Sequence, residues 1–244
     1  MTDRIRRSVQ RAADAAALAG GALHHLALGP GPALTAEWVA AGLELPDLRA
    51  LRQYRLDRIR AQLHHMDYAG IIVMDPMNIR YATDTTNMQV WVMHNGARYA
   101  WIGADGHVVL WEFANCEFLA GHNELVDEVR PAISATYFQA GPRYEEQAQR
   151  WAAELLDVMG HRPGATTRIA VDQCHLRAYE ALTGAGAVVG NGQEVMERAR
   201  AIKSVDEIRA MRCAVHACET TMAELRSMLR PGMTEREVWP VMDA

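Results

Sequence analysis

The chain has 244 residues, of which 50% are hydrophobic and 23% charged, and this balance is typical of folded globular proteins. Its formal net charge is −5 and no window is strongly basic, so the electrostatic footprint of a nucleic-acid-binding protein is missing. No apolar run approaches the ~20 residues that a membrane-spanning helix needs. We therefore expect a folded protein with no nucleic-acid partner and no membrane span.

The first 46 residues are rich in Ala, Gly and Pro, and the Gly-Pro-Gly-Pro sequence at 29–32 is typical of a linker. We therefore expect an N-terminal arm over residues 1–46. Asp14 interrupts the alanine-rich stretch that follows Arg6 and Arg7, which favours a helical arm over a cleaved signal sequence. Sparse and irregularly spaced cysteines indicate free thiols in a cytoplasmic protein. The cysteines are Cys116, Cys174, Cys213 and Cys218.

The first domain is predicted to begin with a helix and a buried strand. Asp47 is a candidate N-cap, and apolar residues recur after it at helical spacing as far as Met66. Residues 70–74 then form a short apolar run that Asp75 and Pro76 terminate, which is the pattern of a strand covered on both faces.

The segments that follow alternate between strand and helix. Residues 97–103 and 107–113 flank Gly106, which can supply the positive φ of a tight turn, so they are predicted to pair as an antiparallel hairpin. The alternation that continues beyond them predicts an α/β domain with a mixed sheet and helices packed against it. The later elements are a helix over 144–159, a strand over 168–172, a helix over 175–183 and a strand over 187–189.

The last part of the chain changes character. Ser204 and Glu207 form a capping box, and the helix that they open carries apolar residues in a three-four alternation. Pro231 ends this helix, and Thr234 with Glu237 forms a second capping box for another helix. We expect the apolar stripe of the long helix to be partly uncovered. Its members are Ile208, Met211, Val215, Cys218, Met222, Leu225 and Leu229.

Several kinds of chemistry lack support in the sequence. There is no GxGxxG or GxxxxGK[ST] motif for nucleotide phosphates and no GxSxG motif for a serine nucleophile. Cys213, His216 and Cys218 lie close in sequence, but on a helix positions 213 and 218 point ~140° apart, so they cannot close a zinc site together. We expect no catalytic residue and no metal ligand in this chain.

The segment from Asp75 to Asn95 is the richest in functional side chains. It follows the buried strand and gathers Asn, Arg, Tyr, Asp, Trp and His in what we interpret as a connection, where binding residues tend to lie. The residues alone leave two interpretations open, a binding site or a hydrogen-bonded turn with Tyr81 and Trp91 in the core.

Two motifs resemble the creatinase/prolidase/aminopeptidase P (pita-bread) family. They are NIRYATDTTNMQVW after the strand, and RARAIKSVDEIRAMRCAVHACETTMAELRSMLRPGMTEREVW near the C-terminus. The resemblance covers residues 47–244 and is strongest to the dimethylsulfoniopropionate lyase branch. It implies a mixed-sheet creatinase-type N-terminal domain over 47–200, followed by the first helices of an incomplete pita-bread α+β domain over 201–244.

The family resemblance also implies a site. In relatives, two divalent metal ions lie in the second domain, held by two Asp, one His and two Glu that this chain does not reach. The N-terminal domain covers the partner subunit's active site, so a homodimer is implied. Trp91, His94 and Asn95 match the lyase-like Trp-x-x-His-Asn pattern and become the expected substrate-binding residues. Gly96 and Ala97 depart from the Pro-aromatic pair expected next, which weakens the lyase interpretation.

The functional prediction is therefore the N-terminal part of a metal-dependent, Xaa-Pro peptidase-type hydrolase that is inactive alone. A dimethylsulfoniopropionate lyase of the same family is the first alternative, and a non-catalytic dimerisation or interaction module is the second. The expected substrate is a short peptide or another small molecule.

Overall fold

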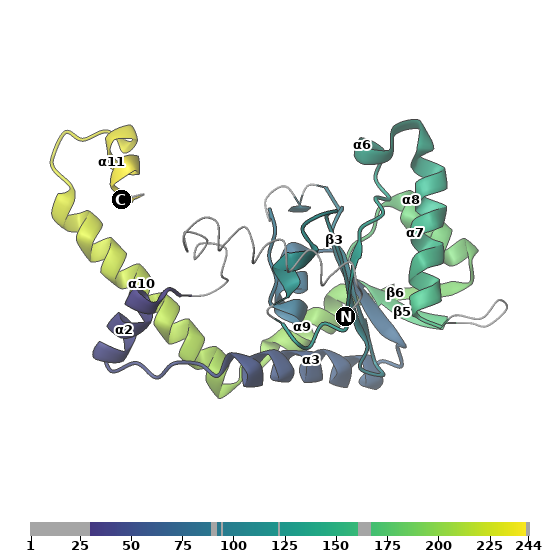
Figure 1. The fold of residues 1–244 in the computed structure, drawn as a ribbon, viewed down its shortest axis with the longest axis horizontal. Coiled ribbons are helices and arrows are strands. Elements are labelled where there is room, and N and C mark those ends of the chain that lie inside the picture. Colours follow the sequence, from purple (N-terminus) through teal and green to yellow (C-terminus); the bar gives the residue numbers. More distant parts are fainter. Residues whose placement is uncertain (1–29, 89–91, 94, 122, 161–166, 243–244) are drawn as a thin grey trace. The chain divides into compact units, whose positions relative to one another are not determined.

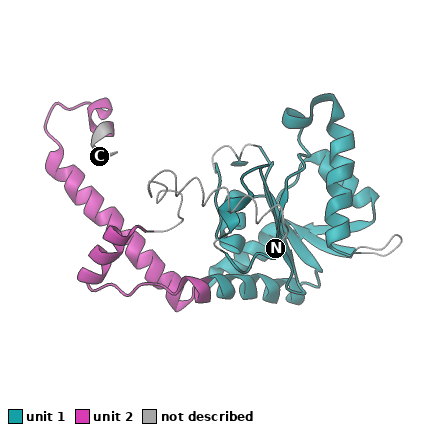
Figure 2. Cartoon of the chain, in the orientation of Figure 1, with its two compact units in different colours: residues 1–28, 52–202 teal, residues 29–51, 203–244 magenta. Residues whose placement is uncertain are grey.

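A computed structural model describes residues 30–88, 92–93, 95–121, 123–160 and 167–242 (Figure 1). Within it, residues 52–202 form one compact unit, and residues 29–51 together with 203–244 form a second (Figure 2). No helix of the described part is long and apolar enough to cross a membrane. Helix α3, Leu48–His65, begins in the second unit and continues into the first. Asp47 caps it, because its Oδ1 accepts hydrogen bonds from the N–H groups of Arg49 and Ala50.

The first unit is built on a six-stranded mixed sheet in the order β4-β3-β2-β1-β5-β6. The predicted mixed-sheet α/β fold is therefore confirmed. The β2–β3 and β1–β2 pairs are antiparallel, whereas β3–β4, β1–β5 and β5–β6 are parallel. The strands are β1 (Gly70–Val73), β2 (Tyr99–Gly103), β3 (Val108–Glu112), β4 (Glu128–Pro131), β5 (Thr167–Val171) and β6 (Ala187–Asn191).

Helices cover both faces of this sheet. Buried residues of α3, α4 (Pro76–Thr83) and α9 (Gly192–Ala201) form one core cluster with residues from the sheet. Buried residues of α7 (Tyr144–Val158) and α8 (Leu176–Gly184) form a second cluster, in which Trp151 and Leu155 are fully buried. Short turns complete the unit: the 3-10 helices Glu117–Ala120 and Gly141–Arg143, and α6 (Tyr137–Ala140).

The predicted hairpin is confirmed in position and direction. Tyr99 pairs with Trp111, Ile102 pairs with Val108, and Gly106 adopts a φ of 110° in the turn between the strands. That conformation is disfavoured for residues with a Cβ, which explains a glycine at this point. The aromatic rings of Tyr99 and Trp111 stack at 5.0 Å, and Trp151 meets Tyr99 edge-on at 5.8 Å.

Several elements of the first unit were not predicted. The segment after β1 was interpreted as a connection, but residues 76–83 form helix α4. Asp75 is its N-cap, accepting hydrogen bonds from the N–H groups of Met77 and Asn78, and Pro76 occupies the first turn, where its missing N–H costs nothing. The other unpredicted elements include α9 and β4, an edge strand whose residues are all half-buried.

Besides the start of α3, the second unit contains α2 (Pro32–Ala40), α10 (Val205–Met228) and α11 (Glu235–Met242). The predicted capping box of α10 is present in full. The box predicted for α11 forms only in half, because the Glu237 carboxylate accepts from both the N–H and the hydroxyl of Thr234, so that hydroxyl does not cap the helix. Residues 30–46, predicted as part of an arm, contain α2 and the buried Trp38.

Candidate functional site

A crevice lies at the carboxyl ends of β1 and β5, which are parallel neighbours in the sheet. The chain leaves β1 into α4, whose apolar side chains join one core cluster, and leaves β5 into α8, whose apolar side chains join the other. The two connections therefore run to opposite faces of the sheet. Such switch points open a crevice outside the strand ends, and ligands of open α/β sheets bind there.

Asp172 lies at the base of this crevice and ties the two strand ends together. Its carboxylate accepts hydrogen bonds from the N–H groups of Met74 (2.8 Å), Asp75 (3.1 Å) and Gln173 (2.7 Å), and from Nδ2 of Asn78 (2.9 Å). Burial raises the pKa of Asp172 above its ordinary value of 3.8, while the four hydrogen bonds oppose that rise. The carboxylate thus holds the crevice in shape.

One side of the crevice is polar. Asn78 extends the network from Asp172, since its Oδ1 accepts a hydrogen bond from Arg200 at 3.0 Å. Arg200 also pairs with Glu197 at 2.7 Å, so its charge is already matched. A hollow of about 340 Å³ lies here, lined by Asp75, Met77, Asn78, Asp172, Gln173, Gln193, Glu197 and Arg200.

The other side of the crevice is narrower and more apolar. A cavity of about 100 Å³ lies there, lined by Met74, Val92, Met93, Gly96, Gln173, Cys174 and His175. A Cβ on Gly96 would lie only 3.0 Å from both Nε2 of His175 and the methyl carbon of Met74. The close approach favours glycine at position 96, which gives a physical reason for the first of the two departures from the Pro-aromatic pair. Burial and the nearby Asp172 raise the pKa of Cys174 to about 12, so this thiol is protonated at neutral pH and is no nucleophile.

Of the three predicted substrate-binding residues, Trp91 and His94 lie outside the described residues. Asn95 is described and is 6% exposed, with its carbonyl oxygen accepting a hydrogen bond from the N–H of Ala97 at 2.6 Å. Next to these positions, Met93 is 60% exposed and lines the apolar cavity. The structure thus places Val92, Met93 and Gly96 at one wall of the crevice, while the role of the three predicted residues stays a prediction.

A buried ion pair anchors the chain on both sides of this wall. Nε of Arg98 donates to Oε2 of Glu112 at 2.7 Å, and the two side chains are 1% and 0% exposed. Arg98 also donates to Thr85, and Asn87 donates to the second oxygen of Glu112 at 3.0 Å. Asn87, which precedes the wall in the chain, and Arg98, which follows it, therefore bind the same carboxylate.

Sequence reasoning missed most of these residues. Arg98 and Glu112 stand one step beyond the Tyr99–Trp111 pair of the predicted hairpin, so extending its register would have paired them. Asp172 was assigned only as the end of a strand, and no sequence signal connected it with Asn78 or the loop that follows β1.

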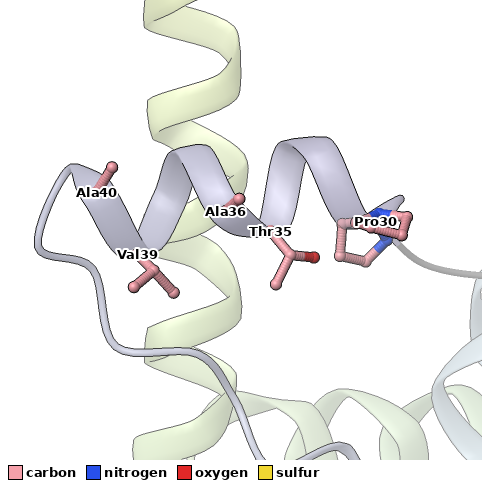
Figure 3. A pocket seen from close by; sticks show the side chains of 6 residues that line it. Pro30, Thr35, Ala36, Val39 and Ala40 are labelled. Atoms are coloured by element: carbon pink, nitrogen blue, oxygen red, sulfur yellow. The ribbon is translucent and has the colours of Figure 1, made fainter.

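A separate hollow lies on the second unit, along α2 (Figure 3). It is lined by Pro30, Pro32, Thr35, Ala36, Val39 and Ala40. Thr35 brings the sole polar side chain of this lining, and its hydroxyl already donates to the carbonyl oxygen of Gly31. This hollow offers no group for catalysis.

No family model matches the sequence. Curated proteins from two bacteria do match the sequence. The chain is 39% identical over 226 residues, 91% of its length, to the dimethylsulfoniopropionate lyase DddP of Roseovarius nubinhibens. It is 40% identical over 226 residues, 90% of its length, to the protein of the same name from Roseobacter denitrificans. The matches cover 51% and 50% of those proteins, so the chain spans about half the length of the curated relatives it matches.

Solved structures show where the fold occurs. A prolidase from Thermococcus sibiricus superposes with a TM-score of 0.56 at 14% identity, over 78% of this chain and 48% of its own. An Xaa-Pro dipeptidase from Bacillus anthracis superposes with a TM-score of 0.53 at 17% identity, over 78% and 47%. The curated relatives and these shared folds together confirm the resemblance to the creatinase/prolidase/aminopeptidase P family. At these identities the solved creatinase-like structures establish the shared fold alone.

The metal ions that the family implies need a cluster of His, Cys, Asp or Glu ligands. Across residues 30–242 with the gaps given above, no group of three or more His, Cys, Asp or Glu side chains is placed to bind a metal ion. Cys213 is buried with its Sγ 3.9 Å from the carbonyl oxygen of Glu44, whereas Cys218 is exposed. The described residues therefore do not fit a metal centre.

Proposed function

We propose that this chain is the N-terminal half of a metal-dependent, creatinase-like lyase that cleaves dimethylsulfoniopropionate. The observation that carries the proposal is the 39–40% identity to two dimethylsulfoniopropionate lyases over about nine-tenths of the chain. This identity outweighs the departure at Gly96 and Ala97, and for Gly96 crowding by His175 offers a local reason. The Xaa-Pro peptidase interpretation keeps the support of the shared fold, at 14–17% identity.

The chemistry of the substrate defines what such an enzyme has to provide. Dimethylsulfoniopropionate carries a sulfonium cation and a carboxylate separated by two carbon atoms. A base removes a proton from the carbon next to the carboxylate, the C–S bond breaks, and acrylate, dimethyl sulfide and a proton result. A binding site for this molecule needs a face for the cation and donors for the carboxylate.

In the proposal, this chain contributes to substrate binding and not to the chemical step. The aromatic face of Trp91 suits a sulfonium cation, and His94 and Asn95 supply polar groups beside it. Support comes from the described neighbours, because Val92, Met93 and Gly96 line one wall of the switch-point crevice and the buried Arg98–Glu112 pair follows them in the chain. The metal ligands and the base would come from the other half of the protein.

The proposed organisation follows the family. Residues 47–200 form the N-terminal domain, residues 201–244 begin the catalytic domain, and residues 1–46 precede both. We propose a cytoplasmic homodimer in which the N-terminal domain covers the partner's active site. The chain alone would have no activity.

A chimera tests this proposal. The 244-residue chain replaces the matching half of the Roseovarius nubinhibens relative, and the chimera, that relative and the chain alone are assayed for two activities. Headspace gas chromatography measures dimethyl sulfide released from dimethylsulfoniopropionate, and a ninhydrin assay measures proline released from a Gly-Pro dipeptide. We expect the chimera and the relative to release dimethyl sulfide, and the chain alone to do neither.

The other outcomes identify the alternatives. A chimera that hydrolyses Gly-Pro without releasing dimethyl sulfide would support the Xaa-Pro peptidase interpretation. A chimera that folds with a thermal midpoint close to that of the relative but has neither activity would support a non-catalytic interaction module. The relative itself, assayed beside them, shows that both the assay and the other half are functional.

A further inference from the structure

The apolar cavity of the crevice contains an imidazole for which the fold provides no partner. His175 is half-buried and lines this cavity of about 100 Å³. It stands at the N-cap position of α8, yet its side chain caps no N–H group of the helix. Among the described residues, its ring has no hydrogen-bond or ion-pair partner. An imidazole carries one N–H donor when neutral and two when charged, so His175 can donate to a ligand.

The imidazole of His175 faces the opposite wall of the cavity. A Cβ on Gly96 would lie 3.0 Å from Nε2 of His175 and 3.4 Å from its Cδ2, so the Nε2 edge of the ring is directed at Gly96. Any side chain at position 96 would occupy the space next to this nitrogen. The glycine therefore keeps Nε2 accessible from the cavity.

Gln173 brings a second polar side chain to the same cavity. It lies two residues before His175 in the connection from β5 to α8, and it lines both the apolar cavity and the polar hollow. Its backbone N–H binds Asp172, whereas its side-chain amide has no partner within the part of the chain that the structure describes. The rest of the lining is Met74, Val92, Met93, Gly96 and Cys174. An apolar pocket with a few polar groups is the usual form of a small-molecule site.

The surroundings of the cavity favour a negatively charged ligand. The described residues that line it include no Asp, Glu, Lys or Arg. Helix α8 begins directly after His175, and its first turn carries no acidic residue, so the partial positive charge of the helix end reinforces the imidazole donor. The negative charge of Asp172 opposes this effect, but the four hydrogen bonds donated to its oxygens partly offset that charge.

The volume of the cavity limits the ligand to a small one. About 100 Å³ is the space of roughly three water molecules at ~30 Å³ each, which suits a ligand of roughly five non-hydrogen atoms. His175 and Gln173 offer donors to a carboxylate. Met74 and Met93 offer apolar surface to a short alkyl chain. Propionate is a molecule of this size and chemistry.

We infer that the apolar cavity of the crevice binds a short-chain carboxylate, with His175 and Gln173 as its hydrogen-bond donors. The inference goes beyond the proposed function, because it concerns a ligand of this chain by itself. A chimera without lyase activity would leave the inference standing, and a chain that binds no carboxylate would leave the lyase proposal standing.

Nuclear magnetic resonance of the histidine rings tests the site in the complete 244-residue chain. In protein labelled with ¹⁵N-histidine, the imidazole signal that is missing from His175→Ala identifies the ring of His175. Titration with propionate at constant ionic strength should shift this signal saturably. We expect a dissociation constant of ~1–10 mM, because a ligand of so few atoms has little binding energy.

Variants on both sides of the cavity locate the ligand. Gly96→Ala adds a Cβ next to Nε2 of His175 and should weaken propionate binding at least ~10-fold. Saturation transfer to the propionate methyl group measures variants without the His175 ring. His175→Ala should lose this transfer, and His175→Gln, which keeps an N–H donor, should retain part of it. His65→Ala, at an exposed position of α3, is the matched control and should bind like the wild type. Thermal midpoints show that each variant is folded.

Several results would overturn the inference. Propionate that leaves the His175 signal unchanged does not bind at this site. Propionamide, a neutral analogue of the same shape, should bind more weakly, and equal binding would show that the cavity does not select a carboxylate. Binding of trimethylsulfonium in place of propionate would make the cavity a cation site. Unchanged binding in a folded Gly96→Ala variant would place the ligand outside the cavity.

Discussion

The buried pair of Arg98 and Glu112 gives the sharpest prediction about stability. Its two side chains are 1% and 0% exposed, and the carboxylate also binds Asn87 and the N–H of Phe113. Replacing Glu112 by Gln keeps the shape and one acceptor oxygen but leaves the Arg98 guanidinium without a counter-charge in the protein interior. Removing one partner of such a pair costs ~3–5 kcal/mol. That is a large share of the ~5–15 kcal/mol by which domains are stable.

Urea unfolding at neutral pH, followed by tryptophan fluorescence and circular dichroism, measures this cost. The double variant Arg98→Met/Glu112→Leu removes both charges and should recover most of the lost free energy of unfolding, because an apolar pair of similar volume replaces a buried ion pair at little cost. Arg143 and Glu146, a surface pair at 2.6 Å with side chains 63% and 53% exposed, provide the control. Glu146→Gln should leave the midpoint unchanged.

Two outcomes would refute this reasoning. If Glu112→Gln is no more destabilising than Glu146→Gln, the pair is not desolvated as the structure places it. If the double variant is as unstable as the single one, the cost comes from lost shape or lost hydrogen bonds and not from an unpaired charge.

Three further predictions concern substrate binding, metal binding and pH. In the active chimera, Trp91→Ala should abolish most turnover with little change in thermal midpoint. Trp151→Ala, which truncates a fully buried side chain, should lower the free energy of unfolding by ~3–5 kcal/mol. A large fall in midpoint for Trp91→Ala would assign that residue to the core. Metal analysis of the chelator-washed and reloaded chain should return less than about one ion per chain, and a tightly bound stoichiometric ion would contradict the assignment of the ligands elsewhere. Burial acts to raise the pKa of Glu128, but hydrogen bonds from Arg130 and His107 lower that pKa below its ordinary value of 4.5. The ionised Glu128 therefore stabilises the fold above pH 4.5, and this contribution is lost as the pH falls through the lowered pKa. Urea midpoints of wild type and Glu128→Gln should therefore converge in acid, and a constant difference down to about pH 3 would argue against this.

Local sequence patterns determined the elements whose signals lie within a few residues. The hairpin turn at Gly106, the apolar run at 70–73 and the Ser204–Glu207 capping box each depend on neighbours in the chain, and the structure confirms all three. The apolar stripe of α10 could also be predicted from the sequence, because the spacing of apolar residues along one helix is a local property. Helix α4 could have been predicted in the same way, since Asp75 before Pro76 is an N-cap followed by a first-turn proline.

Only the tertiary structure decided the crevice and the buried polar networks. Asp172 binds groups that lie 94 to 98 positions away along the chain, and nothing local marks a carboxylate for such a partner. The same holds for the switch point, which exists because the connections after β1 and β5 pack on opposite faces of one sheet. Which strands become neighbours depends on the total burial of apolar surface over the whole domain, and that quantity is not contained in any short segment.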